Sequence, residues 1–203
     1  MNLVRLKINN NMKKIVFIHI NKCGGSSVKR TISKLENIYI PNNDELINYS
    51  LTDEWHQSIK FTIIRNPYDR ILSLYGMLKR DNKNYTLNEV INIITDDTID
   101  YKTDNNKLPS GKEYVKRHGL RLTHPHYSIY KNGQIIIDYI FKLENIEKDW
   151  LKIQNIIKTN VNLQHVNKSN IKKDYSIFTK DQLNKINSYF KDDFEVFNYE
   201  IIK

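Results

Sequence analysis

Residues 13–27, KKIVFIHINKCGGSS, decide the fold of this chain. Lys13 to Ile20 are a nearly continuous run of β-favouring residues, the pattern of a strand that is covered on both faces in a parallel sheet. Two adjacent glycines end that run, and apolar residues then recur at the spacing of a helix. Those helical positions are Val28, Ile32 and Leu35, with Ser26 or Ser27 placed to cap the first turn. The sequence therefore predicts a strand, a tight loop and a helix.

A second unit of the same kind follows a polar stretch around Pro41 to His56. Ile59 to Ile64 are predicted to form a strand that ends at Arg65, and Pro67 suits the first position of a new helix. The buried stripe of that helix is expected at Tyr68, Ile71, Leu72, Tyr75 and Leu78. Two strand–helix units in succession are typical of a parallel sheet with helices packed against it.

The rest of the chain continues this alternation. Residues 81–121 are polar with little periodicity, and we interpret them as the variable, acceptor-facing part. Ile135 to Phe141 predict a further strand, and helices are expected after Asn145 and after the capping-box pattern of Thr179 to Gln182. The apolar positions of these two helices are Ile146, Trp150, Ile153, Ile157, Leu183, Ile186 and Phe190. The fold class is therefore α/β, a single domain with a mainly parallel central sheet flanked by helices.

Length and cysteine content set the domain organisation. A chain of 203 residues can bury one good core, so residues 13–203 are expected to form one domain. Residues 1–12 are interpreted as an N-terminal extension that is dispensable if translation starts at Met12.

Cys23 is the single cysteine, which excludes an intramolecular disulfide and a zinc site of several thiolates. The apolar run of residues 15–20 is far shorter than the ~20 residues of a membrane span, and no signal-peptide cleavage pattern follows it, so we expect a cytoplasmic protein.

The charge balance favours anionic partners. Lys and Arg number 32 against 23 Asp and Glu, so the formal net charge is +9. Nucleotides, sulfated sugars, nucleic acids and membrane surfaces all suit such a charge. A coding bias toward lysine would explain part of it without any partner, and charge alone does not select among these possibilities.

The loop after the first strand has the composition of an anion-binding site. Gly24 and Gly25 let the backbone approach an anion closely, and the N–H groups at the start of the following helix point toward it. Lys22 adds a positive charge, and Ser26 and Ser27 add hydroxyl donors. The alternative is an ordinary glycine turn with a lysine that faces solvent. The ATPase signature G-x-x-x-x-G-K-[ST] does not fit, because the lysine precedes the glycines.

The end of the second strand offers another anion-binding group. Ser73 lies eight residues after Arg65, about two helical turns, so its hydroxyl can share a helix face with groups near Arg65. A guanidinium and a hydroxyl together suit a phosphate dianion. Alternatively, Arg65 and Asp69 form a surface ion pair and Ser73 only packs. Because loops after neighbouring parallel strands meet at one sheet edge, we expect the two groups to bind one ligand with two anionic ends.

These residues resemble the motifs of carbohydrate sulfotransferases that use 3′-phosphoadenosine 5′-phosphosulfate (PAPS). The resemblance is to the group of heparan sulfate 2-O- and 6-O-sulfotransferases and their microbial and viral relatives. Residues 17–27 are similar to the first motif of that group, although Asn21 replaces proline and Cys23 replaces threonine. Residues 65–75 match the second motif closely. Weaker similarities lie at residues 123–127, 141–145 and 165–169.

The resemblance implies a P-loop-like nucleotide-binding architecture and a role for each motif. Lys22 would act in catalysis at the bridging oxygen of the phosphosulfate, the loop backbone would hold the 5′-phosphate, and Arg65 with Ser73 would hold the 3′-phosphate. PAPS would be the co-substrate and adenosine 3′,5′-bisphosphate the product, with no metal required. The implied nucleotide-binding residues are Lys22, Cys23, Gly24, Gly25, Ser26, Ser27, Arg65, Ser73, Lys168 and Ser169.

The general base is expected between the two motifs. The acceptor hydroxyl must lose a proton, and relatives supply a His or Glu from this segment, which points to His56 as a second catalytic residue. His19 is expected to be a structural residue of the strand. The rivals of His56 are Asp44, Glu45, Asp53, Glu54, His124 and His126.

Two other functions fit the same sequence. A P-loop-like kinase or NTP-hydrolysing enzyme would place a magnesium-holding carboxylate at a strand end and prefer ATP. A non-catalytic protein that binds nucleic acid or a polyanionic glycan would show strong salt dependence and no preference for PAPS. The resemblance favours a carbohydrate hydroxyl as acceptor, with a tyrosine or a small metabolite as the alternatives, and no nucleic-acid partner. The sequence does not indicate an oligomeric state.

Overall fold

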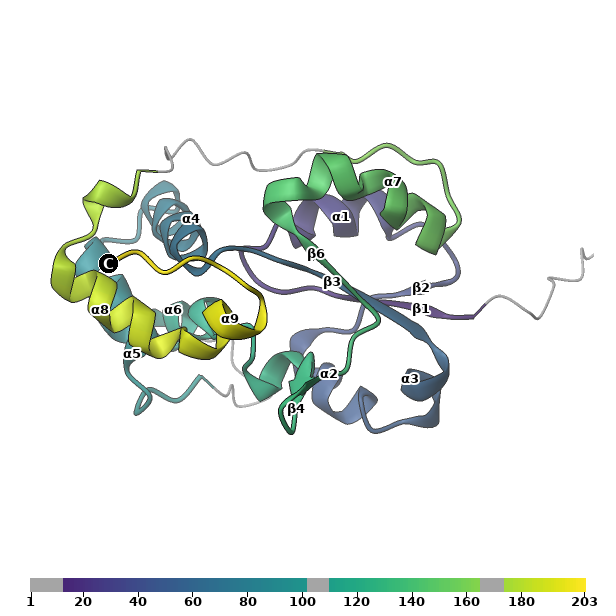
Figure 1. Ribbon diagram of the computed structural model, residues 1–203, viewed down its shortest axis with the longest axis horizontal. Coiled ribbons are helices and arrows are strands. Elements are labelled where there is room, and N and C mark those ends of the chain that lie inside the picture. The colour runs from purple at the N-terminus through teal and green to yellow at the C-terminus, as the bar shows by residue number, and fades with distance from the viewer. Residues whose placement is uncertain (1–12, 102–109, 165–173) are drawn as a thin grey trace, which may run out of the picture.

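The computed structural model of this protein describes residues 13–101, 110–164 and 174–203. Its central sheet has four parallel strands in the order β2-β1-β3-β6 (Figure 1). Their bounds are β1 Ile15–Ile18, β2 Ile38–Tyr39, β3 Ile59–Ile64 and β6 Tyr139–Lys142. In the register of β1 and β3, Ile18 lies opposite Thr62, so the loops that follow these two strands start at the same edge of the sheet.

Helices cover both faces of the sheet because side chains alternate along the strands. Phe17 belongs to the core on one face and Val16 to the core on the other. The first face carries α1 (Gly25–Ile32) and α7 (Ile146–Ile157), and the second carries α2 (Asn43–Tyr49) and α3 (Asp53–Gln57). Figure 1 shows α1 and α7 above the sheet and α2 and α3 below it.

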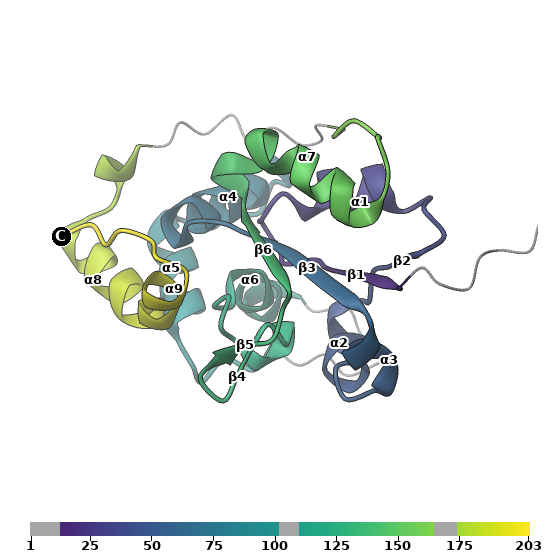
Figure 2. The same ribbon diagram turned by 45° about the vertical axis from the view of Figure 1, so that its right-hand side comes forward.

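A group of helices continues beyond the carboxyl ends of the strands (Figure 2). It contains α4 (Pro67–Arg80), α5 (Leu87–Thr95), α6 (Gly111–Gly119), α8 (Lys180–Tyr189) and α9 (Lys191–Val196). These helices share a core of their own, in which Tyr68, Ile91 and Phe190 are fully buried. Since α4 starts directly after β3, its first turn lies at the edge where the strands end.

Shorter elements complete the described part of the chain. They are the hairpin of β4 (Tyr130–Lys131) and β5 (Gln134–Ile135) and the 3-10 helices Pro125–Tyr127, Leu143–Asn145 and Tyr175–Ile177. Within the described ranges, no helix combines the length and the apolar composition that a membrane crossing needs. The N-terminal extension of residues 1–12 lies outside the described residues.

Elements with strong local signals form where the sequence predicts them. β3 spans the expected residues 59–64, and α4 begins at Pro67 with Asn66 as its N-cap. α8 has the expected capping box between Thr179 and Gln182. The α/β class, with a parallel central sheet and flanking helices, is confirmed.

Residues 81–121 are not irregular as expected, because they contain α5 and α6. The start of α5 is a capping box in which Thr86 and Glu89 bond to each other's backbone N–H groups. Its buried positions are Leu87, Val90, Ile91, Ile93 and Ile94. Both signals are visible in the sequence, so the interpretation of this stretch as non-periodic was wrong. The polar stretch before β3 likewise contains α2 and α3, which were not expected.

The expected strand from Ile135 to Phe141 is split in two. Asn132 and Gly133 have positive φ angles of 50° and 77°, which suits the tight turn between β4 and β5. This turn pairs Ile135 with the preceding strand, and β6 starts only at Tyr139. The Asn-Gly pair is a hairpin signal, and it outweighs the continuous apolar run that follows it.

Candidate functional site

The two predicted anion-binding groups lie at the same edge of the sheet and touch each other. The glycine loop, residues 19–24, follows β1, and Arg65 follows the neighbouring strand β3. Arg65 Nη1 donates a hydrogen bond to the main-chain oxygen of Lys22 over 3.3 Å. The guanidinium therefore turns toward the loop, as binding of one ligand with two anionic groups requires.

The glycine loop presents main-chain N–H groups at the start of α1. Gly24 is the N-cap, with a left-handed φ of 75°, and no side chain caps the helix. The expected capping by Ser26 or Ser27 is therefore wrong, because both residues already lie within the helix. Within the described residues, the N–H groups of Gly24, Gly25 and Ser26 have no backbone hydrogen-bond acceptor. Such groups at the positive end of a helix can bind an anion.

Gly25 leaves no room for a side chain under this loop. A Cβ atom added there would lie 2.0 Å from Cδ2 of His19. Burial, followed by the charges of Lys29 and His118, lowers the pKa of His19 to about 4, so the ring is neutral at neutral pH. These contacts support a packing role for His19 beneath the start of α1.

Gly25→Ala is therefore expected to destabilise the protein by about 1–3 kcal/mol, because an overpacked site must shift its neighbours. The shift also displaces the loop, so affinity for adenosine 3′,5′-bisphosphate should fall with the melting temperature. Gly133→Ala is the control: no atom lies within 4 Å of the Cβ added there, and the left-handed φ of Gly133, which Gly25 does not share, confines any strain to the hairpin turn. Calorimetric titration should show weakened binding for Gly25→Ala alone; equal affinities for both variants would refute this role of Gly25.

Lys22 lies among other cations and beside a thioether. Its Nζ contacts Sδ of Met77 at 3.2 Å. Burial, then Arg80 and Arg65, lower its pKa to about 8, while Asp81 acts in the opposite direction. The residue also has a φ of 63°, a conformation that is uncommon outside glycine and clusters at functional sites. An anion bound in the loop would favour the ammonium form of this side chain.

Arg65 is held from its other side by Asp69. Arg65 Nε lies 4.0 Å from Asp69 Oδ2, and the Tyr175 hydroxyl donates to Oδ1 of the same carboxylate at 3.0 Å. The side chain of Asp69 is only 1% exposed, so the alternative of a surface ion pair is wrong. The buried carboxylate instead orients the guanidinium that faces the loop.

Two buried side chains shape the glycine loop from within. Arg70 donates to the main-chain oxygens of Leu120, at 2.9 Å, and Asn21, at 3.4 Å. The Cys23 side chain is fully buried, and burial raises the pKa of its thiol to about 11, so it stays protonated. Cys23 was expected among the nucleotide-binding residues, but its N–H bonds to the oxygen of Ile20 and its thiol lies in the core.

Ser73 lies on the face of α4 that runs beside the loop. Asp69, Ser73 and Met77 are spaced four residues apart, which places them on one face of the helix. Asp69 is the residue that contacts Arg65. Met77 is the residue that contacts Lys22. Ser73, which is partly exposed, therefore lies between these two contacts.

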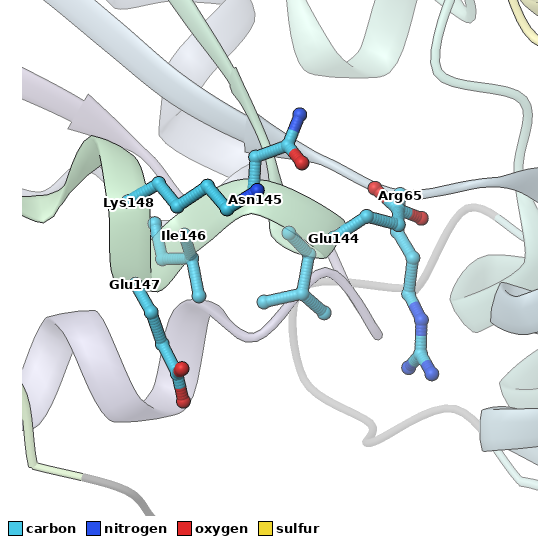
Figure 3. A pocket seen from close by; sticks show the side chains of 7 residues that line it. Arg65, Glu144, Asn145, Ile146, Glu147 and Lys148 are labelled. Carbon is cyan, nitrogen blue, oxygen red and sulfur yellow. The ribbon is translucent and has the colours of Figure 1, made fainter.

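A pocket of about 400 Å³ lies next to Arg65 and the start of α7 (Figure 3). Its lining residues are Arg65, Leu143, Glu144, Asn145, Ile146, Glu147 and Lys148. Leu143 also borders the glycine loop, since a Cβ atom at Gly24 would lie 2.5 Å from its Cδ1. Glu144 accepts a hydrogen bond from the Asn66 N–H at 2.8 Å, which ties this wall to the start of α4. The pocket thus includes Arg65 of one anion-binding group, borders the loop of the other through Leu143, and has the size of a small-ligand site.

Two of the remaining predicted nucleotide-binding residues lie on α1, and the other two lie outside the described residues. Ser26 is exposed on the first turn of α1, and Ser27 is partly exposed. Lys168 and Ser169 lie outside the described residues, as does the similarity at residues 165–169. Over the described ranges, no three or more His, Cys, Asp or Glu side chains gather as metal ligands would.

The structure does not bring His56 to this site. His56 lies on α3, which precedes β3, whereas Arg65 follows the same strand. A strand of this length spans about 20 Å. Lys14, just before β1, pairs with Glu54 of α3 over 2.6 Å, so α3 lies at the amino ends of the strands. His56 is therefore at the opposite edge of the sheet from Lys22, and Glu54 lies there with it.

The two later histidines form a cluster of their own. Nε2 of His124 lies 3.2 Å from the hydroxyl of Tyr101, and the rings of His126 and Tyr101 pack edge to face. Burial and the neighbouring His126 lower the pKa of His124 to about 4. Thr123 beside them is bonded to the buried Asp193 of α9. These contacts support a structural role for both histidines.

His118, which the sequence analysis did not single out, lies near Lys22. Its pKa is lowered mainly by burial and also by the charge of Lys22, while its hydrogen bond to Tyr114 acts in the opposite direction. Nδ1 lies 2.8 Å from the main-chain oxygen of Tyr114. Because a carbonyl oxygen only accepts, Nδ1 carries the proton and Nε2 the lone pair. His118 was missed because its helix, α6, was not expected.

Comparisons with known proteins bear on the family and the fold of this chain. A sequence profile described as the sulfotransferase family matches residues 6–200. The crystal structure of a sulfotransferase from Alicyclobacillus acidocaldarius aligns with 93% of this chain and 97% of that chain, with a TM-score of 0.51 and 13% sequence identity. At that identity the likeness concerns the fold alone. No curated protein sequence matched the chain. The profile supports the broad family and does not single out the heparan sulfate group.

Proposed function

This chain belongs to the sulfotransferase family, and from that premise we propose that it transfers a sulfuryl group from PAPS to a hydroxyl of a carbohydrate. The contact between Arg65 and the glycine loop carries the proposal. PAPS has a phosphosulfate and a 3′-phosphate on one ribose, and the chain offers two cationic groups that meet at one sheet edge. The motif resemblance to the heparan sulfate group supports a sugar acceptor.

The donor is proposed to lie across the glycine loop and the pocket of Figure 3. The open N–H groups of the loop fit the 5′-phosphate, with the hydroxyls of Ser26 and Ser27 as further donors. Arg65 and Ser73 are proposed to bind the 3′-phosphate, which leaves the pocket beside Leu143 for the nucleoside. The residues proposed to cover the nucleotide from its far end are Lys168 and Ser169.

Lys22 is proposed to be the catalytic cation. PAPS supplies a sulfuryl group that is bonded to a good leaving group, the 5′-phosphate. The Lys22 ammonium stabilises the negative charge that develops on the bridging oxygen, and its desolvated position strengthens this interaction. The strained φ of Lys22 fits this role, because strain at a loop is retained where it orients a reacting group.

A thermal-shift comparison of adenosine 3′,5′-bisphosphate, AMP and ATP tests the proposed function. A ligand at ~100 times its Kd stabilises the folded state by about 2.7 kcal/mol. The bisphosphate should raise the melting temperature most, AMP less, and ATP no more than AMP. Stabilisation by ATP alone would instead support the kinase alternative, and indifference to all three nucleotides would support a polyanion-binding protein.

The pH dependence of transfer should report the lowered pKa of Lys22. Below pH 8 the free protein carries the ammonium, and above it the charge is lost, so kcat/KM for PAPS should fall as pH rises through about 8. Bound donor favours the ammonium, so the corresponding fall in kcat should occur at a higher pH. Lys22→Arg keeps a charge that does not titrate in this range and should lose the alkaline fall. A wild-type kcat/KM that stays flat to pH 10 would contradict this assignment.

A further inference from the structure

We propose that the acceptor binds as a single sugar ring in a pocket between the end of α4 and the start of α6, and that His118 takes the proton from its reacting hydroxyl. This inference rests on the proposed sulfuryl transfer, to which it adds the second substrate and the general base. The acceptor pocket has a volume of about 370 Å³, near the lower end of the range of ligand pockets. Its lining includes Leu78, Asp81, Lys83, Tyr85, Gly111 and Tyr114.

The wall contributed by the end of α4 is fixed by main-chain hydrogen bonds. Asn82 has a left-handed φ of 53°, and its N–H donates to the oxygen of Lys79 at 3.1 Å. The N–H of Lys83 donates to the oxygen of Leu78 at 2.8 Å, which completes a common helix-ending motif. The N–H of Tyr85 then bonds to the oxygen of Lys83 at 2.9 Å. Asp81, Lys83 and Tyr85 of the lining therefore lie on an ordered turn.

The end of α4 connects the acceptor pocket with Lys22. Met77, whose Sδ lies 3.2 Å from Lys22 Nζ, directly precedes Leu78 of the lining. The Asp81 carboxylate is close enough to both Lys22 and Tyr114 to raise the pKa of each. The pocket and the cation that is proposed to assist departure of the leaving group therefore lie at the same end of α4.

His118 lies on the same face of α6 as the lining residues of that helix. Gly111, Tyr114 and His118 follow the spacing i, i+3 and i+7 of one helical face. The rings of Tyr114 and His118 lie 4.2 Å apart between centroids. Because Nδ1 donates to the oxygen of Tyr114, Nε2 is the nitrogen that can accept a proton. His118 is thus held in the tautomer that a general base needs, next to the pocket and near Lys22.

The lining fits a sugar ring better than a phenol. A pyranose has apolar faces that pack on aromatic side chains and hydroxyl groups at its edge. Tyr85 and Tyr114 provide aromatic surfaces, and Leu78 adds apolar area. Asp81 offers a strong acceptor and Lys83 a strong donor to ring hydroxyls. Asp81 also pairs with Arg80 over 3.5 Å, and a phenol, with its single hydroxyl, could bond to only one of the two charged groups.

In the proposed step the sulfuryl group moves to the acceptor oxygen and one proton moves to His118. The acceptor oxygen forms a bond to sulfur while its proton passes to Nε2 of His118. The bond between sulfur and the bridging oxygen breaks, and its electron pair stays on that oxygen, which leaves with adenosine 3′,5′-bisphosphate. The Lys22 ammonium stabilises this charge, and the proton on His118 is then released to solvent.

Binding of the acceptor is tested on protein saturated with adenosine 3′,5′-bisphosphate. Saturation-transfer NMR would be recorded with methyl pyranosides of glucose, galactose, N-acetylglucosamine and glucuronic acid, and with phenol. At least one pyranoside should show a signal that Asp81→Asn and Tyr114→Ala each reduce at least 5-fold. Tyr139→Ala, which changes an exposed tyrosine of β6, should leave it unaltered. Signals from phenol alone, or a pyranoside signal that neither pocket variant changes, would overturn the proposed acceptor site.

Turnover of PAPS with the bound pyranoside separates the base from the pocket. His118→Asn keeps a donor for the Tyr114 oxygen but has no proton acceptor, so kcat should fall about 10²–10⁴-fold with little change in acceptor KM. Asp81→Asn should mainly raise that KM. Normal kcat in His118→Asn, or a loss with His56→Asn instead, would overturn the assignment of the base. Nucleotide affinity is measured for each variant, because a wild-type protein that does not bind the bisphosphate contradicts the donor proposal and not the acceptor site.

Discussion

Replacement of Lys22 by alanine is expected to lower kcat for sulfuryl transfer by about 10²–10³-fold. The cause is loss of the one ammonium that lies in the glycine loop and faces the proposed bridging oxygen. Affinity for adenosine 3′,5′-bisphosphate should change by less than about 10-fold, because the loop N–H groups and Arg65 still hold its two phosphates. Rapid-quench measurement of bisphosphate formation in a single turnover gives the rate of the chemical step.

Lys34→Ala is the matched control for this experiment. Lys34 is exposed shortly after the end of α1, so its loss removes one positive charge without changing the loop. It should retain the turnover of the parent protein. If Lys22→Ala also kept normal turnover, Lys22 would have no part in the mechanism.

Arg65→Ala should weaken binding of adenosine 3′,5′-bisphosphate about 100-fold, which corresponds to about 3 kcal/mol. AMP lacks the 3′-phosphate, so its affinity should fall less than about 3-fold. The variant also leaves the buried Asp69 carboxylate without its arginine, so unfolding must be followed in parallel to separate lost stability from lost binding. Calorimetric titration of both nucleotides at one temperature gives the two ratios.

Two further variants show whether the effect belongs to the guanidinium itself. Arg65→Lys keeps a charge but loses the planar fork, so it should recover part of the affinity and not all of it. Arg30→Ala, on the exposed side of α1, should not alter the ratio of the two nucleotides. Equal losses of AMP and bisphosphate affinity in Arg65→Ala would show that Arg65 does not bind the 3′-phosphate.

The core of the fold and the meeting of Arg65 with the glycine loop could be predicted from the sequence because their signals are local. A buried strand, a glycine loop and an amphipathic helix occur within residues 13–35, and a strand that leads into Pro67 repeats the pattern. Parallel pairing places both loops at one edge of the sheet, so the sequence predicts that Arg65 lies near the glycine loop. The contact of Arg65 with the oxygen of Lys22 agrees with this prediction. The burial of the Cys23 side chain could not be predicted, since sequence does not show which side of a loop a side chain occupies.

The proposed acceptor pocket was less predictable, because it depends on how helices pack and not on one motif. The capping box at Thr86 and the apolar stripe of α5 are present in the sequence, but polar neighbours on both sides obscure them. Without α6, nothing linked His118 to Lys22. His56 was chosen by its position between two motifs, whereas the direction of β3 places it at the far edge of the sheet.

A crystal structure of the complex with adenosine 3′,5′-bisphosphate is the most direct measurement of the central claim. We predict the 5′-phosphate within hydrogen-bond distance of the N–H groups of Gly24, Gly25 and Ser26, and the 3′-phosphate in contact with Arg65 and Ser73. The nucleoside between them should occupy the pocket beside Leu143. A nucleotide bound away from the glycine loop, or an Arg65 guanidinium that touches neither phosphate, would contradict the account.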